Sequence, residues 1–535
     1  MTDKTDCRRD CAVSADDIAD MAPAQELMPV WRASVRMALV TAASLLAAGL
    51  IVTGLGGCAD MSGIVPTSSL RDAPSLGLTP VASQAAPEAP VAAEWWRDFG
   101  DETLNTLVAQ TLASSPNLKL AQARMARAQA ATEVAKAATL PQVAGQIDLT
   151  RQRYTANGAV PPALAGAILN SGTAQLSASW ELDFFGKNRA ALDAALGSAN
   201  AAEADAQAAR VLLASQVART YFQLVRLNEQ AGVARRTLAQ REETLTLVRD
   251  RVNAGLDTRL ELRQSEGGLP EARLQLQTVQ EQMALTRNAL DALIGQPNSA
   301  LALVPSAQAA IKIVALTPQI NADLLGRRAD IAAARWRALA SASDVVNAKS
   351  QFYPNINLVA FAGLSSIGLS RLVDSGSQQW GVGPALRLPV FDAGRLRANL
   401  RGKTADFDAA IESYNAAVID AVHDAADQIA SSQAIVGQQA EQRAAQEAAE
   451  SAYEIAVQRY KAGLGNYLNV LTAETAVLAQ RRLAVDLAAR VLDTQVALIR
   501  ALGGGYAPEP VAPMLKNMKL IADSGHAASA EAAFD

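Results

Sequence analysis

Two long intervals without proline limit what this chain of 535 residues can fold into. The first runs from Gly186 to Gly255 and the second from Gly394 to Gly463, so the two glycines are 69 positions apart in both. The chain has 21 prolines, yet neither interval contains one. Apolar side chains in the first interval recur at the three- and four-residue spacing of a helix: Leu213, Val217, Tyr221, Leu224 and Leu227. At about 1.5 Å per residue, each interval predicts a helix roughly 100 Å long, which needs coiled-coil neighbours to bury its apolar stripe.

The two intervals belong to an internal repeat. The stretch "RVNAGLDTRL" (251–260) returns as "RYKAGLGNYL" (459–468), at the same offset of 208 residues that relates the first glycines of the intervals. Self-similarity at a fixed offset indicates a repeated structural unit. We therefore predict two repeats, at 93–317 and 318–505. In each, the glycine inside the repeated stretch turns the chain and a second helix returns. The returning helices are predicted at 269–294 and 470–502.

Each repeat also carries two strands. A helix-period stretch, 103–138 in the first repeat, ends at a proline, Pro141 or its counterpart Pro354, and strict alternation follows. The large apolar members of the four alternating runs are Val143, Ile147, Leu149, Leu176, Trp180, Leu182, Ile356, Leu358, Trp380, Val382, Leu386 and Leu388. A strand with one apolar and one polar face is typical of a sheet that covers a soluble core, and equally of a membrane barrel.

The membrane interpretation requires more than one copy of the chain. Four strands cannot close a barrel, and an open sheet edge is not tolerated in lipid. A trimer would supply twelve strands and twelve helices. The predicted fold class is therefore mixed α and β. Each of the two repeats has two membrane β-strands and long α-helical hairpins, and three copies form a 12-stranded β-barrel that continues as an α-helical tunnel.

The N-terminal segment has the pattern of an export signal. Residues 37–57 are apolar or small, Arg32 and Arg36 precede them, and Cys58 follows. The order is that of a secretory signal peptide, and "LGGC" at its end resembles a bacterial lipobox, whose cysteine is acylated and becomes the new N-terminus. An uncleaved membrane helix is the alternative, because the run is long enough to span a bilayer. We predict a signal peptide over 1–57 with Met28 as an alternative start, a lipid-anchored linker over 58–92, and a flexible tail over 506–535.

Charge and composition argue against two other classes of protein. The net charge of -5 and the pI of about 5.4 leave no basic face for nucleic acid. The two histidines, His423 and His526, and the three cysteines, Cys7, Cys11 and Cys58, show no metal-ligand spacing. The chain contains no nucleophile-elbow, P-loop or zinc-protease motif. We therefore predict that the protein is not an enzyme and uses no cofactor and no metal.

Several stretches together resemble one known family. They are "EWWRDFGDETLNTLVAQTLASSPNLKLAQAR" (94–124), "ASWELDFFGKNRAAL" (178–192), "LLGRRADIAAARWR" (324–337) and "LPVFDAGRLRANL" (388–400). With the two repeated turns, they resemble the TolC/OprM family of outer-membrane efflux proteins, in its NodT-like lipoprotein branch. The resemblance implies a trimeric barrel in the outer membrane, continued by a periplasmic α-helical tunnel. It also implies the exit duct of a tripartite pump that exports small molecules such as drugs or aromatic acids. The partners implied are a periplasmic membrane-fusion adaptor and an inner-membrane transporter of the RND type.

Two other functions stay open at this stage. One is a duct for type I protein secretion, built on the same fold. The other is a lipid-anchored coiled-coil spacer without a pore, which would form no stable trimer and conduct no ions.

The resemblance also assigns roles to residues at and near the two turns. Adaptor docking falls to Ala254, Gly255, Leu256, Ala462, Gly463 and Leu464. The constriction falls to Tyr460, which matches a tyrosine of the family, and to Asn469 and Thr472, which stand where relatives carry aspartate. The acids Glu261, Glu266 and Glu474 lie nearby and are candidates to ring the pore and favour cations, or alternatively are solvated helix charges.

Overall fold

The computed structural model describes residues 61–71, 91–157, 161–301, 303–313 and 327–507. The predicted signal peptide, Cys58 and nearly all of the predicted tail lie outside the described residues. Among the residues described, none of the helices combines the length and the apolar character needed to cross a bilayer.

Four antiparallel strands form one sheet, and the two repeats contribute two neighbouring strands each, as predicted. In sequence and in space the order is β1 (Gln142–Arg153), β2 (Ile168–Leu182), β3 (Asn355–Ile367) and β4 (Gln378–Arg387). The register places the predicted apolar positions of all four strands on one face. Large side chains on that face are exposed: Val143, Ile147, Leu149, Leu176, Trp380, Val382 and Leu386. Within the described chain, β1 and β4 each leave one edge unpaired.

Two helices of equal length confirm the prediction from the proline-free intervals. They are α4 (Lys187–Asn253) and α8 (Arg395–Lys461), with 67 residues each. Gly186 and Gly394 precede them with φ of 73° and 84°, a left-handed conformation that glycine adopts without a steric cost.

The returning helices start earlier than predicted. They are α5 (Arg259–Ile294) and α9 (Tyr467–Ala501), against predicted starts at 269 and 470. The side chains of Thr258 and Asn466 accept hydrogen bonds from the N–H groups of Leu260 and Asn469, and these caps start both helices ahead of the predicted positions. As a result α5 contains Pro270 in its interior.

The prediction of one helix over 103–138 is wrong. The chain forms α2 (Glu102–Ser114) and α3 (Pro116–Ala137), separated at Ser115, whose ψ of 125° is not helical. The ring of a proline disfavours the α conformation of the residue before it, and proline is well suited to the first turn of a new helix. Sequence periodicity continues across such a break and therefore does not reveal it.

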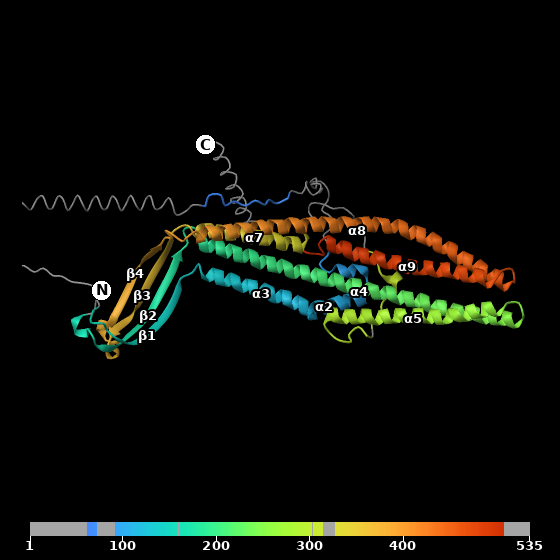
Figure 1. Ribbon diagram of the computed structural model, residues 1–535, viewed down its shortest axis with the longest axis horizontal. Coiled ribbons are helices and arrows are strands. Elements are labelled where there is room, and N and C mark those ends of the chain that lie inside the picture. The colour runs from blue at the N-terminus through green and yellow to red at the C-terminus, as the bar shows by residue number, and fades with distance from the viewer. Residues whose placement is uncertain (1–60, 72–90, 158–160, 302, 314–326, 508–535) are drawn as a thin grey trace, which may run out of the picture. The chain divides into compact units, whose positions relative to one another are not determined.

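The helices pack side by side around α4. Near the sheet, α4 lies between α3 and α7 (Ala329–Ser350); farther away it lies between α5 and α9, and α8 runs along α7 and α9 (Figure 1). Small residues allow the backbones to approach closely: a Cβ added to Gly197 of α4 would lie 3.0 Å from the Cβ of Ala340 on α7. Farther along α4, an aromatic cluster is buried, in which Phe99 contacts Phe222 with ring centroids 5.1 Å apart.

Candidate functional site

The two turns between the long helices adopt the same conformation. Gly255 and Gly463 have φ of 73° and 74°. In the first turn the N–H of Leu256 donates to the carbonyl of Arg251 at 2.9 Å, and in the second the N–H of Leu464 donates to the carbonyl of Arg459 at 2.8 Å. This is the Schellman pattern, which requires a left-handed residue. The glycines are therefore explained by the turn itself.

Both turns present an apolar side chain to solvent. Leu256 is 65% exposed and Leu464 is 70% exposed, while Ala254 and Ala462 beside them are also exposed. Nothing lies within 4 Å of the position that a side chain on Gly255 or Gly463 would occupy. The six residues predicted to dock an adaptor thus form two equivalent, accessible surfaces within one protomer, and their docking role stays a prediction.

Tyr460, the predicted constriction residue, connects the two turns. Its ring is 1% exposed, and its hydroxyl donates a hydrogen bond to the carboxylate of Asp257 in the other repeat. The Nε of Arg251 lies 2.9 Å from the same carboxylate, and the guanidinium of Arg251 lies 4.6 Å from the centroid of the Tyr460 ring. We call Arg251, Asp257 and Tyr460 the turn triad.

The electrostatics of the turn triad favour the paired state. Burial alone raises the pKa of Asp257, but the hydrogen bonds from Arg251 and Tyr460 outweigh it, and the net pKa lies below the usual value. Burial and the bond to Asp257 raise the pKa of Tyr460, so its hydroxyl keeps its proton and acts as the donor. At neutral pH the triad is an arginine cation, a carboxylate anion and a neutral phenol.

A second polar cluster joins the two hairpins further from the turns. The Nε of Arg241 on α4 lies 3.3 Å from Oε1 of Glu474 on α9. Its Nη1 lies 2.9 Å from Oε2 of Glu271 and donates to the carbonyl of Gly268 at 2.8 Å, both on α5. We call Arg241, Glu271 and Glu474 the hairpin cluster.

Glu474 is the buried member of the hairpin cluster. The residue is 6% exposed, so its carboxylate lies between helices rather than on a solvated face of the protomer. Burial raises the pKa of Glu474 above its usual value, and the charge of Arg241 offsets part of that rise. Its predicted role in ringing the pore stays a prediction.

The other predicted constriction residues have local partners or are exposed. Glu261 forms a capping box with Thr258, and the hydrogen bond from the Thr258 side chain lowers the pKa of Glu261. Glu266 pairs with Arg263 at 2.8 Å. Asn469 and Thr472 are exposed on the first turns of α9.

Sequence reasoning missed Arg251, Asp257 and Arg241 as functional candidates. The sequence contained one signal for these residues: the two turns repeat at an offset of 208 residues but differ at the positions that link them. Asp257 corresponds to Gly465 in the second repeat, and Tyr460 corresponds to Val252 in the first. The two turns are thus alike in backbone and differ in the side chains that link them. In the part of the chain that the structure describes, no group of three or more His, Cys, Asp or Glu side chains could hold a metal ion.

Comparison with known proteins defines the class to which this architecture belongs. The model of the outer membrane efflux protein family matches residues 107–296 and 320–504. Multidrug resistance outer membrane protein MdtQ of Escherichia coli O157:H7 is 32% identical over 427 residues, which cover 77% of this chain and 88% of the relative. MdtP of Escherichia coli K12 is 31% identical over 432 residues, covering 78% of this chain and 88% of the relative.

Solved structures agree with the sequence comparison. The outer membrane protein VceC of Vibrio cholerae superposes with a TM-score of 0.74 at 36% identity, covering 78% of this chain and all of VceC. The outer membrane channel CmeC of Campylobacter jejuni gives a TM-score of 0.74 at 25% identity, covering 86% and 98%. The fold is therefore that of a TolC-like outer-membrane channel. The chain belongs to the outer membrane efflux protein family, and it serves as an exit duct in the outer membrane.

Proposed function

We propose that three copies of this protein form the outer-membrane exit duct of a tripartite efflux pump. One observation carries the proposal: among the residues that the structure describes, β1 and β4 each leave one edge of the sheet unpaired, while the apolar face of the sheet is exposed. An open edge in lipid leaves backbone groups without hydrogen-bond partners, and pairing β1 of one copy with β4 of the next removes both edges. Three copies would give twelve strands.

The exported molecules are small molecules such as drugs or aromatic acids. The relatives MdtQ and MdtP carry multidrug resistance in their names, which favours efflux over protein secretion. The inner-membrane partner, an RND-type transporter, supplies the energy. The duct itself therefore contributes a pathway, and no catalytic step is assigned to its residues.

A periplasmic adaptor docks at the two turns. Leu256 and Leu464 are exposed apolar side chains in matching backbone frames, and apolar area removed from water stabilises an interface by about 25 cal/mol per Å². The turn triad holds the two turns of each protomer together, and we propose that breaking it opens the duct. Tyr460 is buried within the protomer, so it restricts the duct by holding the two turns together through the triad and not by projecting into the passage.

The segment that follows the proposed lipid anchor packs on the helical part of the protein. Three residues beyond Cys58, the segment 61–71 lies along α8: the N–H of Thr67 donates to Asp408 at 3.0 Å, and the N–H of Arg71 donates to Asn415 at 3.1 Å. We propose that Cys58 is acylated. The intact mass of the purified protein tests this proposal. Acylation adds the mass of the acyl chains, and this added mass should be absent from the Cys58→Ala variant.

Oligomeric mass in detergent and single-channel conductance in planar bilayers test the duct. We expect a mass of three chains and a conductance that rises when the triad is broken by Asp257→Asn. A trimer that conducts in neither form would contradict the role of the triad. A monomer without conductance would contradict the duct and leave a lipid-anchored spacer.

A further inference from the structure

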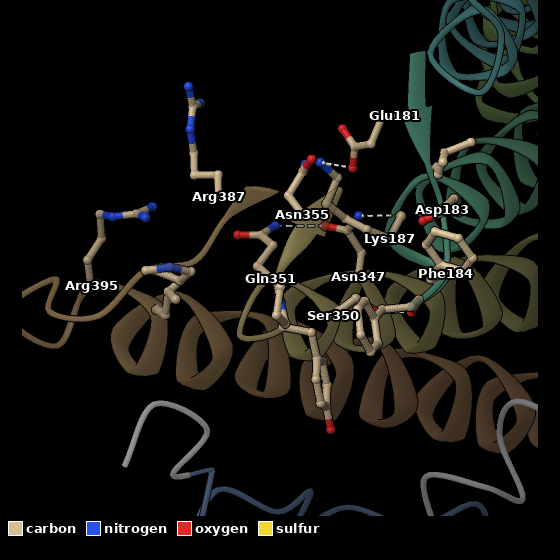
Figure 2. Close-up of a pocket in the computed structure, with 16 residues that line it drawn as sticks. Glu181, Asp183, Phe184, Lys187, Asn347, Ser350, Gln351, Asn355, Arg387 and Arg395 are labelled. Atoms are coloured by element: carbon tan, nitrogen blue, oxygen red, sulfur yellow. Dashed lines mark hydrogen bonds and ion pairs between the residues drawn. The ribbon is translucent and has the colours of Figure 1, made fainter. Parts of the chain in front are cut away.

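A polar pocket lies where the strands meet the long helices. Its volume is about 410 Å³, and it is lined by the ends of β2 and β4, the start of β3, the end of α7 and the starts of α4 and α8 (Figure 2). The turn triad lies at the other ends of α4 and α8, and the hairpin cluster lies on α4, α5 and α9, so nothing in the proposed opening of the duct uses this pocket.

The acids of the pocket already have partners. Glu181 pairs with Lys187 at 2.6 Å. Asp183 accepts hydrogen bonds from the N–H groups of Asn188 at 3.1 Å and Arg189 at 2.8 Å, at the start of α4. Glu181 is therefore neutralised by a cation, and the oxygens of Asp183 are occupied by backbone donors.

Two arginines of the same pocket differ from these acids because their side chains have no partner in the described part of the chain. Within the described part of the chain, the guanidinium groups of Arg387 and Arg395 have no hydrogen-bond or ion-pair partner, and both residues are exposed. Figure 2 shows both side chains on one side of the pocket, away from the Glu181–Lys187 pair. The net electrostatic character of this side of the pocket is therefore positive.

The sheet register shows which face of β4 carries this charge. Trp380, Val382 and Leu386 lie on the exposed apolar face, and Arg387 lies on the opposite face. Its partner across the ladder is Asn355, which also lines the pocket. When such a sheet closes in a membrane, the apolar face meets lipid and the polar face meets the water-filled interior. Arg387 then faces the passage that exported molecules follow.

We propose that Arg387 and Arg395 form an anion-binding station inside the duct, at the junction of barrel and tunnel, for the carboxylate of small organic anions. The inference rests on the proposed function. A guanidinium offers a planar pair of donors that matches a carboxylate. Phe185, stacked on Tyr353 with centroids 4.9 Å apart, supplies an apolar wall in the same pocket for a ring attached to that carboxylate.

Reversal potential in planar bilayers of zwitterionic lipid tests the station. The background is Asp257→Asn, which opens the duct, and the salt is a gradient of potassium chloride. Removing both charges with R387Q/R395Q is expected to lower the chloride-to-potassium permeability ratio at least twofold. Benzoate added to the parent is expected to reduce the chloride current, and the double variant to require at least threefold more benzoate for the same reduction.

Two matched variants sharpen the result. R387K/R395K keeps the charge and loses the planar donors, so ion selectivity should return while the effect of benzoate stays weak. Arg153→Gln removes the same charge at the far end of β1, opposite Ile168, and should change neither readout. The single variants Arg387→Gln and Arg395→Gln replace the double variant if that protein does not assemble.

The outcomes separate the inference from the function on which it rests. A conducting double variant with unchanged permeability ratio and benzoate response would overturn the station and leave the duct intact. A loss of trimer mass in the double variant and in both single variants would instead show that the arginines serve assembly, which also overturns the station. A background protein that is a monomer and does not conduct would overturn both.

Discussion

The two helical hairpins share a backbone design and differ in the polar side chains that connect them. Both have a long helix of 67 residues and a left-handed glycine in a Schellman turn. The first hairpin carries the acid of the turn triad and the arginine of the hairpin cluster, whereas the second supplies Tyr460 and Glu474. Repetition thus sets where the turns lie, and divergence between the repeats creates the contacts between them.

The largest expected effect comes from removing the arginine of the hairpin cluster. Arg241→Met leaves Glu474 buried without its cation, and losing one partner of a buried ion pair costs about 3 kcal/mol or more. We expect a clear drop in the melting temperature of the trimer. Arg249→Met is the control, because Arg249 is 55% exposed and its pair with Glu266 spans 3.9 Å. Equal losses in both variants would contradict a special role for the cluster.

The next effect distinguishes the two turns directly. Arg251 and Arg459 are equivalent in the repeat, but Arg251 bonds to Asp257, whereas Arg459 is exposed and donates to the carbonyl of Leu464 in its own turn. Arg251→Gln removes charge-assisted bonds that together contribute about 2 kcal/mol, so open probability should rise roughly thirtyfold. Arg459→Gln should change it little. Single-channel recording checks both, and a similar rise in the two variants would exclude a closing role that is particular to the triad.

Adaptor binding should depend about equally on the two turns, because their exposed leucines lie in the same backbone conformation. Leu256→Ser and Leu464→Ser each remove an exposed apolar side chain from the same backbone frame, so each is expected to weaken adaptor binding by about tenfold. The measurement is the affinity of the purified trimer for a periplasmic adaptor that binds the unaltered protein. A loss of affinity in only one of the two variants would show that the adaptor binds one turn and not the other.

The smallest effect concerns pH. Because the pKa of Glu474 is raised above its ordinary value of 4.5, the folded protein holds this proton more tightly than the unfolded chain does. The contribution of Glu474 to the free energy of unfolding therefore falls as pH rises from 4.5 through the raised pKa. Around Glu474 lie Arg241, Glu271 and Arg481. Melting temperatures between pH 4 and 8 should vary less in Glu474→Gln, whereas Glu266→Gln at the equivalent position should keep the profile of the unaltered protein.

The sequence predicted the features that depend on local patterns. The alternation after Pro141 and Pro354 located the strands, and the proline-free intervals located α4 and α8 nearly to the residue. The turn glycines were found because the stretches that contain them repeat at an offset of 208 residues. The break at Ser115 was missed because apolar periodicity runs through it.

The contacts between the hairpins were beyond sequence reasoning. Tyr460 and Asp257 are 203 residues apart, and Arg241 and Glu474 are 233 apart. Nothing local in a sequence states that two such residues meet, because their contact depends on how the two hairpins pack against each other. Tyr460 was identified through resemblance, while its partners were not.

The equal length of α4 and α8 restricts how this gene can change. One residue added to a helix moves everything beyond it by about 1.5 Å and rotates it by about 100°. An insertion in α4 alone would carry Asp257 away from Tyr460, and an insertion in α8 alone would do the reverse. Length variation in the tunnel is therefore expected in matched pairs, one in each repeat, so that a lineage that lengthens one helix must lengthen the other.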